Sequence, residues 1–359
     1  MGALSFPADD APGLAPMEAR LVDALPEGDG WQYEPKWDGF RCIAWKDGER
    51  VALRSRSDKP LGRYFPELVA LLAGLKVERV VLDGELIIPM GESLSFAALQ
   101  ARLHPAASRI ARLSQETPAQ FMTFDCLALE DEDLVERPLA ERRHVLAAFV
   151  RRQRNPALLL SPATDDAKIA ARWLAQAGGA LDGVVAKRTD LPYRPGERAM
   201  AKLKQHRTAD CVVGGFRYAS GDTRAVGSLL LGLHDAAGRL DHVGFTSSFD
   251  AATKAALLET VEPLIGGSGF TGDTPGGPSR WATERSAEWQ PLTPKLVAEV
   301  RYDQVTGGRF RHGTTFQRWR PDKAPEDCTK AQLARELRPR ELEALLDLPR
   351  APSQAAKRV

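Results

Sequence analysis

The sequence predicts a mixed α/β domain followed by a small all-β barrel. Up to about Arg207, segments with helical spacing of apolar residues alternate with strand-like segments. After Arg207 the pattern changes to short apolar strands separated by Gly and Asp turns, which is typical of a small barrel. The length of 359 residues favours two domains, each large enough to bury a core.

The first domain begins with two strand-like pieces that meet at Asp47-Gly48. The segment "GRYFPELVALLAGL" has helical spacing, and "RVVLDGELIIP" predicts a strand pair bent at Asp83-Gly84. A helical "SFAALQARL", a strand "AQFMTFDCLAL" and a long helix from Leu139 to Arg152 follow. The helix in "DAKIAARWLAQA" then precedes the strands "LDGVVAKR" and "AMAKLKQ".

The second domain contains the short strands "ADCVVGGFRYASGD", "GSLLLGLHDAAGRL", "DHVGFTSSFD" and "LVAEVRYDQVT". One helix near "AATKAALLETVEPLI" interrupts them, and the last stretch, "KAQLARELRPRELEALLDL", has helical periodicity. We therefore expect an α/β domain over residues 1–207, a barrel over 208–330 and a helical tail over 331–359.

The overall charge excludes the simple signature of a strongly basic nucleic-acid binder, because 49 basic residues nearly balance 48 acidic ones. Two stretches are nonetheless basic: Lys187 to Arg207 has seven basic and two acidic residues, and Arg301 to Lys323 has six and two. Such runs are usually solvated faces, but two of them can line one groove that attracts phosphates. The four cysteines are scattered without a Cys-x-x-Cys pair, so neither a disulfide framework nor a zinc site is indicated. No apolar run approaches the length of a membrane span, and a cytoplasmic protein is expected.

Lys36 stands in "YEPKWDGFRCIAW" between a proline and a tryptophan, just before Asp38-Gly39. Asp38-Gly39 predicts a tight turn. On this local pattern alone, Lys36 is a solvated lysine beside a hairpin turn. Only matching chemistry elsewhere in the chain favours a catalytic role.

Seven motifs supply that match: "KWDGFR", "SRS", "LDGELI", "FMTFD", "LDGVVAK", "AKLK" and "RWRPDK". In this order they resemble the motif set of the covalent nucleotidyltransferases, which comprise ATP-dependent DNA ligases, RNA ligases and mRNA capping enzymes. The likeness is greatest to the short bacterial ATP-dependent DNA ligases of the ligase C type. It implies an α/β (α+β) nucleotidyltransferase domain with ATP-grasp-like antiparallel sheets, followed by an all-β OB-fold barrel.

The resemblance makes Lys36 the nucleophile that attacks the α-phosphate of ATP. A protonated lysine cannot attack, so nearby cations and partial burial are expected to favour the neutral amine. Lys187, Lys202, Lys204 and a divalent metal are the expected sources of that positive field. Lys202 and Lys204 are two residues apart on a predicted strand, which places both on one face.

The nucleotide contacts also follow from the family pattern. Glu34 lies against the nucleotide, whereas Arg41 and Arg56 contact ribose or DNA phosphates, a role that suits the planar guanidinium fork. Phe124 stacks on the adenine, with Phe121 as the alternative, although alternating aromatic residues on a strand usually pack in a core.

Glu85 and Asp182, in the two "DG" motifs, are implied contacts of Mg²⁺ or Mn²⁺ or of the ribose. In the family pattern most relatives carry Glu where this chain has Asp182, and a bridging water can make up the length of the shorter side chain. Arg320 and Lys323 in the last motif would orient the pyrophosphate leaving group while the barrel is closed over ATP.

The resemblance implies an ATP-dependent DNA ligase that acts as a monomer on nicked double-stranded DNA, near the nucleoid, together with repair proteins. The segment before Lys36 is far shorter than a domain, so no additional DNA-encircling domain is expected there. An RNA ligase or a GTP-using capping enzyme is the alternative on the same scaffold. A non-catalytic OB-fold module that binds nucleic acid is the alternative of another class.

Overall fold

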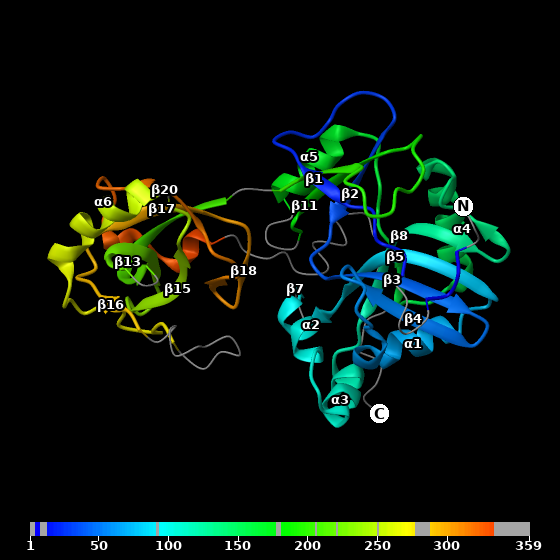
Figure 1. Ribbon diagram of the computed structural model, residues 1–359, viewed down its shortest axis with the longest axis horizontal. Coiled ribbons are helices and arrows are strands. Elements are labelled where there is room, and N and C mark those ends of the chain that lie inside the picture. Colours follow the sequence, from blue (N-terminus) through cyan, green and yellow to red (C-terminus); the bar gives the residue numbers. More distant parts are fainter. Residues whose placement is uncertain are drawn as a thin grey trace. The chain divides into compact units, whose positions relative to one another are not determined.

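The computed structural model describes residues 4–7, 13–90, 93–176, 181–204, 207–219, 222–249, 251–276 and 288–333. The described residues fall into two compact units, one up to Lys204 and one from Arg207 onward (Figure 1). The helical tail predicted for residues 331–359 lies outside the described residues except for the end of a 3-10 helix, η4 (Lys330–Gln332), and Leu333.

The described part of the first unit contains two main β-sheets. The smaller has the strand order β1-β12-β11-β2, with bounds Ala19–Leu21, Met200–Leu203, Gly183–Arg188 and Trp31–Lys36. The larger has the order β10-β8-β5-β3-β4, with bounds Leu158–Leu160, Gln120–Leu129, Arg79–Ile87, Phe40–Asp47 and Arg50–Ser55. Only β1 with β12 and β10 with β8 pair in parallel among these ladders. The short strands are β9 (Glu132–Asp133), which pairs with β8, and the hairpin of β6 (Pro89–Met90) and β7 (Ser93–Leu94).

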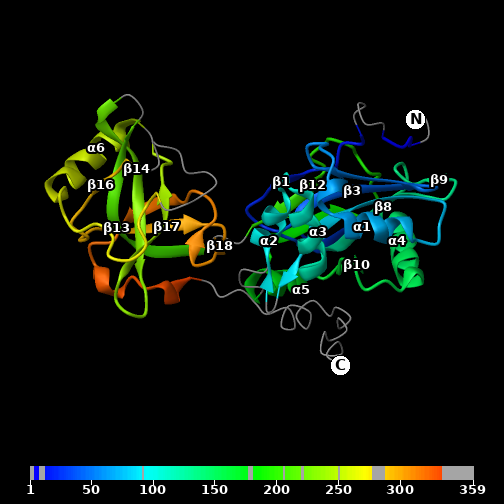
Figure 2. The ribbon, with the colours of Figure 1, turned by 90° about the horizontal axis from the view of Figure 1, so that it is seen from below.

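Helices cover the outer faces of both sheets (Figures 1 and 2). The first unit has α1 (Pro66–Ala73), α2 (Phe96–Arg102), α3 (Ala107–Glu116), α4 (Leu139–Gln153), α5 (Ala167–Gln176) and the 3-10 helix η1 (Gly62–Tyr64). Apolar residues of α1, α2 and α4 pack with Cys42, Leu82 and Phe121 of the larger sheet. On the smaller sheet, Trp173 of α5 packs with Ala186.

The inner faces of the sheets follow from the two-residue period of a strand. Ile43, Trp45 and Val81 point away from the helices and form an apolar cluster with Met200 of the smaller sheet. Arg41 shares the face of Ile43 by the same alternation. The inner faces are therefore apolar at one end and carry polar side chains where the chain approaches Lys36.

The structure of this unit differs from the sequence predictions in two places. The strand pair predicted at Asp83-Gly84 is wrong, because β5 runs unbroken through both residues. The Asp-Gly pair marks a shift in the register between β5 and β8 instead of a turn. The helix α3 was not predicted, because its apolar residues are few and only Ile110 is buried.

The second unit contains a sheet in the order β15-β14-β13-β17-β20, with bounds Leu240–Thr246, Asp222–His234, Arg207–Ala219, Val297–Tyr302 and Thr315–Trp319. A parallel bridge between Thr246 and Thr314 joins the end of β15 to the residue before β20, so the two edges of the sheet meet. The interior is apolar and includes Phe216, Leu230 and Val300. The small all-β barrel predicted from the sequence is therefore present.

The remaining elements of this unit are short. Helix α6 (Ala251–Val261) and the 3-10 helix η2 (Glu262–Leu264) follow β15. The short elements after them are β16 (Gln290–Pro291), β18 (Val305–Thr306), β19 (Arg309–Phe310) and the 3-10 helix η3 (Pro325–Asp327). In the described residues, no helix combines the length and apolarity needed to cross a membrane.

Candidate active site

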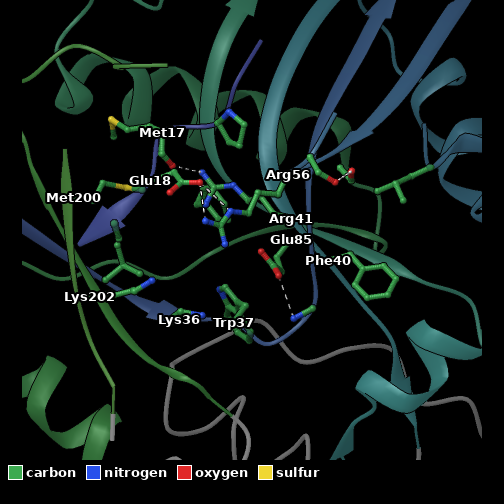
Figure 3. Close-up of a pocket in the computed structure, with 18 of the residues that line it drawn as sticks. Met17, Glu18, Lys36, Trp37, Phe40, Arg41, Arg56, Glu85, Met200 and Lys202 are labelled. Atoms are coloured by element: carbon green, nitrogen blue, oxygen red, sulfur yellow. Dashed lines mark hydrogen bonds and ion pairs between the residues drawn. The ribbon is translucent and has the colours of Figure 1, made fainter. Parts of the chain in front are cut away.

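A cavity of about 840 Å³ opens between the inner faces of the two sheets of the first unit (Figure 3). Most of the predicted site residues line it: Glu34, Lys36, Arg41, Arg56, Glu85, Phe124, Lys187 and Lys202. Asp182 and Lys204 adjoin it through Lys36. Arg320 and Lys323 belong to the second unit.

Lys36 is the last residue of β2, and the turn after it passes the chain from one sheet to the other. Where the sequence predicts a tight turn at Asp38-Gly39, the chain bends at Gly39, and β2 and β3 do not form a hairpin because they belong to different sheets. A Cβ atom at Gly39 would lie 2.1 Å from the Leu86 carbonyl oxygen, so only glycine fits this crossing. Lys36, just before this crossing, lines the cavity.

Asp182 joins two lysines at this point. One carboxylate oxygen lies 2.5 Å from Lys36 Nζ, and the other lies 3.3 Å from Lys204 Nζ. The Asp182 amide also donates to the Lys36 carbonyl at 2.9 Å, which holds the two backbones in register. Burial raises the pKa of Asp182, but the charges of Lys36 and Lys204 outweigh burial and hold that pKa below its usual range. Asp182 therefore stays ionised beside the proposed nucleophile.

A row of side chains across the smaller sheet faces the cavity. Val185 of β11 pairs with Glu34 on one side and with Lys202 on the other, and all three line the cavity. Burial lowers the pKa of Lys202, and the charges of Lys36 and Lys204 lower it further. Strand β12 ends at Leu203, so Lys204 follows the strand and reaches Asp182 from beyond its end.

The aromatic ring of Phe124 makes cation–π contacts with two side chains. Arg41 and Lys187 lie over its ring at 4.4 Å and 4.6 Å from the centroid. Lys187 in turn donates to Glu34 at 2.9 Å. Phe121 lies in the helix-covered core on the far side of the sheet, away from the cavity.

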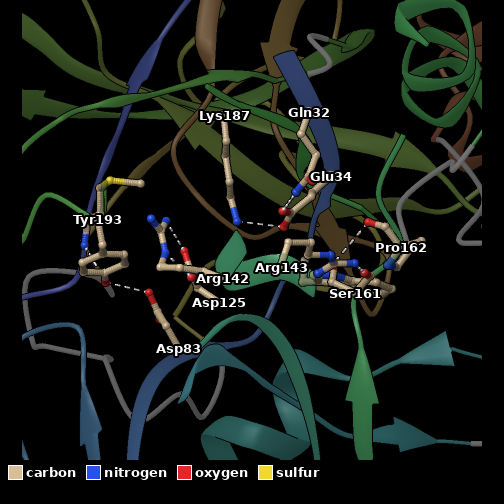
Figure 4. A network of polar contacts seen from close by, with 12 residues as sticks. Gln32, Glu34, Asp83, Asp125, Arg142, Arg143, Ser161, Pro162, Lys187 and Tyr193 are labelled. Atoms are coloured by element: carbon tan, nitrogen blue, oxygen red, sulfur yellow. Dashed lines mark hydrogen bonds and ion pairs between the residues drawn. The ribbon is translucent and has the colours of Figure 1, made fainter. Parts of the chain in front are cut away.

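Arg41 is held by a network that sequence reasoning missed, of which Figure 4 shows the contact between Tyr193 and Asp83. The Asp83 carboxylate accepts from Arg41 Nε and Nη2, both at 2.6 Å. Tyr193 donates to Asp83 at 2.7 Å and accepts from the Met17 amide at 2.8 Å. Asp83 stands in the quoted "LDGELI" two residues before Glu85, on the same strand face, which is the signal that could have identified it.

Among the carboxyl groups that line the cavity, Glu85 has the pKa that is shifted furthest from its ordinary value. Burial raises its pKa to about 7, against the opposing charges of Arg41 and Lys36. Its Oε1 atom accepts from the Gly39 amide at 3.1 Å. Among the described residues there is no cluster of three His, Cys, Asp or Glu side chains that could cage a metal. Magnesium typically takes one or two carboxylates and completes its shell with phosphates and water, so Glu85 fits such an ion.

Arg56 lies at another edge of the cavity and pairs with Glu18 at 2.7 Å. In the second unit, Arg320 donates to Asp210 at 2.9 Å and to Asp322 at 2.8 Å, and the backbone amide of Lys323 donates to the Arg320 carbonyl at 3.2 Å. These acidic partners fix the direction of the Arg320 guanidinium on the barrel.

The comparisons with known proteins match both units. The model of the ATP-dependent DNA ligase domain matches residues 12–204, and that of the ATP-dependent DNA ligase C-terminal region matches residues 222–323. The chain belongs to the ATP-dependent DNA ligase family. The predictions of a DNA ligase and of the short ligase C type are confirmed, because DNA ligase C2 of Mycolicibacterium smegmatis is 45% identical over 90% of this chain and 94% of its own.

Two further similarities extend this result. The ligase is 31% identical to the multifunctional non-homologous end joining DNA repair protein LigD of Mycobacterium tuberculosis, over 88% of this chain and 40% of the relative. A solved structure of a Lig E DNA ligase, described as binding DNA with a minimal scaffold, shares the fold with a TM-score of 0.50 and 17% identity. That match covers 84% of this chain and 99% of the Lig E chain.

Proposed function

We propose that the ligase seals nicks between a 3′-hydroxyl and a 5′-phosphate in double-stranded DNA through an adenylate on Lys36. The observation that carries this assignment is that Lys36 lines the cavity, with its Nζ atom 2.5 Å from Asp182. In the first step, the neutral Lys36 amine forms an N–P bond to the α-phosphorus of ATP as the bond to pyrophosphate breaks, and the amine proton passes to solvent or to the departing pyrophosphate. The AMP then passes to the 5′-phosphate of the nick, and attack by the 3′-hydroxyl forms the phosphodiester and releases AMP.

The cavity residues have separate parts in this sequence. Phe124 supports the adenine from the wall of the cavity, and Glu34 and Lys187 border the nucleotide. Lys202 neutralises phosphate charge, and Arg41 is held ready by Asp83 to meet ribose or phosphate.

Asp182 orients the nucleophile. A carboxylate whose pKa is held low is a poor proton acceptor, so it aims the Lys36 amine instead of removing its proton. Both Asp182 oxygens contact lysines, which favours Glu85 over Asp182 as the direct ligand of Mg²⁺ or Mn²⁺. When bound, such an ion neutralises charge on the phosphates.

The second unit is proposed to be an OB-fold. Its strand order, its helix α6 between the third and fourth long strands and its closing parallel bridge support that assignment. We assign residues 1–207 to the nucleotidyltransferase domain, 208–330 to the OB-fold and 331–359 to a tail. Arg320 and Lys323 would serve the adenylation step from the OB-fold. We also propose a monomer that acts in DNA repair in the cytoplasm, on the nucleoid; the likeness to the LigD repair protein supports the repair role.

Incubation with ATP labelled at the α-phosphate tests the assignment. The purified protein is expected to form an acid-resistant AMP adduct that Lys36→Ala abolishes, together with all sealing of unadenylated nicks. A parallel incubation with labelled GTP tests the capping alternative. Labelling that persists in Lys36→Ala contradicts the nucleophile assignment.

A further inference from the structure

Glu18 occupies a fixed position at the edge of the active-site cavity. Its amide donates to the Glu197 carbonyl at 2.8 Å, and its carbonyl accepts from the Met200 amide at 3.1 Å. These bonds hold the backbone just before β1 against the segment that leads into β12. The carboxylate is therefore presented from a constrained backbone, with 27% of the side chain exposed.

Two arginines contact this carboxylate. Arg56 donates to Oε1 from Nη2 at 2.7 Å and from Nε at 3.0 Å, and Arg198 Nε lies 3.8 Å from Oε2. The hydrogen bond from Arg56 holds the pKa of Glu18 below its usual range, and the charges of Arg198 and Lys202 act in the same direction. Figure 3 shows Glu18 and Arg56 meeting beside Met17 and Met200.

Arg198 connects this position to a second basic cavity. That cavity, of about 320 Å³, has four arginines in its lining: Arg20, Arg188, Arg194 and Arg198. It shares Met200 with the active-site cavity, so the two hollows adjoin across β12. Glu18 thus stands between an arginine of one cavity and an arginine of the other.

We propose that Glu18 takes the place of a DNA backbone phosphate in the free ligase, and that the DNA strand at the nick displaces it to bind Arg56 and Arg198. This proposal rests on the proposed function, since it requires nicked DNA at the active site. It assigns Arg198, outside the seven motifs, to the DNA-binding surface and makes Glu18 a competitor of the substrate.

The ion pairs have the properties that such an exchange requires. Arg56 and Arg198 expose 65% and 75% of their side chains, and exposed pairs contribute little stability. In the free protein, two nitrogens of the Arg56 guanidinium donate to a single oxygen of Glu18. A phosphodiester offers two oxygens, so each of these nitrogens can have an acceptor of its own. Entry of the phosphate leaves the Glu18 carboxylate without its arginines, which lowers the affinity of the ligase for DNA.

Binding of nicked duplex to the wild type and to Glu18→Gln tests the proposal, with Glu116→Gln as the matched control. Glu116 is an exposed carboxylate in an exposed arginine pair on α3, outside both cavity linings. Glu18→Gln is expected to tighten binding about fivefold at moderate salt and to steepen the salt dependence by about one counterion, because no freed carboxylate takes up a cation. Glu116→Gln is expected to leave both quantities unchanged.

A double-mutant cycle separates this exchange from long-range repulsion. In an Arg56→Ala/Arg198→Ala background, the gain from Glu18→Gln is expected to disappear. Weaker binding in Glu18→Gln would mean that Glu18 holds the arginines in their DNA-binding geometry, and a gain that persists without the arginines would mean simple repulsion; either result overturns the proposal. Lys36 labelling without DNA is measured in parallel, since a wild type that neither labels nor binds nicked duplex contradicts the proposed function itself.

Discussion

Asp182 bridges Lys36 and Lys204, with one carboxylate oxygen 2.5 Å from the Lys36 amine and the other 3.3 Å from the Lys204 amine. Both lysines are about a quarter exposed, whereas Asp182 is only 11% exposed. Gly183, next in the chain, pairs with Lys36 across the sheet, and a Cβ atom there would lie 2.1 Å from the Leu203 carbonyl oxygen. The end of β2, the start of β11 and the end of β12 therefore lie close together, and this brings the three charged side chains into contact.

Removal of this carboxylate tests its orienting role. Asp182→Ala is expected to slow formation of the Lys36 adduct about hundredfold, because a misplaced nucleophile loses most of the advantage of proximity. Asp182→Glu, which keeps a carboxylate at this position, is expected to retain most of the rate. Asp190→Ala removes an exposed carboxylate from the same segment of the chain and serves as the control. Normal labelling in Asp182→Ala would exclude the orienting role.

Glu85 predicts a dependence of stability on pH. Its pKa rises from 4.5 in the unfolded chain to about 7 in the folded one, so the folded state binds more protons between these values. The contribution of Glu85 to the free energy of unfolding is therefore fully present below pH 4.5, and it is lost as the pH rises through about 7. Glu85→Gln, which keeps an acceptor for the Gly39 amide, is expected to stabilise the protein by roughly 2 kcal/mol at pH 8 and by much less at pH 5.

Thermal unfolding at the two pH values measures this difference. Glu116→Gln is the control, because that carboxylate is exposed and its loss should have no such pH dependence. An equal change in melting temperature at pH 5 and pH 8 for Glu85→Gln would show that the folded protein does not shift this pKa.

The two phenylalanines of "FMTFD" are expected to respond differently to truncation. Phe124→Leu removes the aromatic face that lines the cavity and should raise the KM for ATP in adenylation about tenfold, within the range measured for stacking of a base on an aromatic ring. Phe121→Leu changes a core position and should lower the melting temperature without changing that KM. Steady-state adenylation and thermal unfolding of both variants check this; a raised KM in Phe121→Leu would reverse the assignment.

The sequence predicts the parts of the site that lie on regular strands close to a turn. By the two-residue period of a strand, Glu34 and Lys36 share one face, as do Val185 and Lys187, and all four residues line the cavity. The turn at Asp38-Gly39 was also predicted, but its role in joining two different sheets was not. A local pattern specifies where the chain bends. Which strands pair with the segments on either side of the bend depends on contacts between residues that are distant in sequence.

The supporting groups could not be predicted for the same reason. Tyr193 reaches Asp83 across 110 positions of sequence, and Glu18 meets Arg56 across 38. Neither Tyr193 nor Glu18 belongs to a recognisable motif, and each resembles an ordinary surface residue in its local context. Their roles arise from the packing of the segment before β1 against both sheets.

The barrel provides the last prediction, which concerns the order of steps. If Arg320 and Lys323 orient pyrophosphate while the barrel is closed over ATP, Arg320→Ala and Lys323→Ala should slow adenylation strongly. A pre-adenylated nick has already lost its pyrophosphate, so both variants should seal it far better, relative to the wild type, than an ordinary nick. Arg318→Ala is the matched control, because Arg318 is an exposed arginine two residues away that pairs with Glu299.

Saturating DNA is needed in this comparison, because the loss of a phosphate contact also weakens DNA binding. Each lost contact reduces the slope of the affinity against salt concentration, on logarithmic scales, by about one. Asp210→Asn provides a second check: it keeps the Arg320 side chain but removes the charge of its partner on β13, and it should produce a milder form of the same defect. Equal defects on the two substrates at saturating DNA would mean that Arg320 and Lys323 serve DNA binding or the later chemical steps. In that case the acidic partners of Arg320 would hold a DNA-contacting group and not one that acts on ATP.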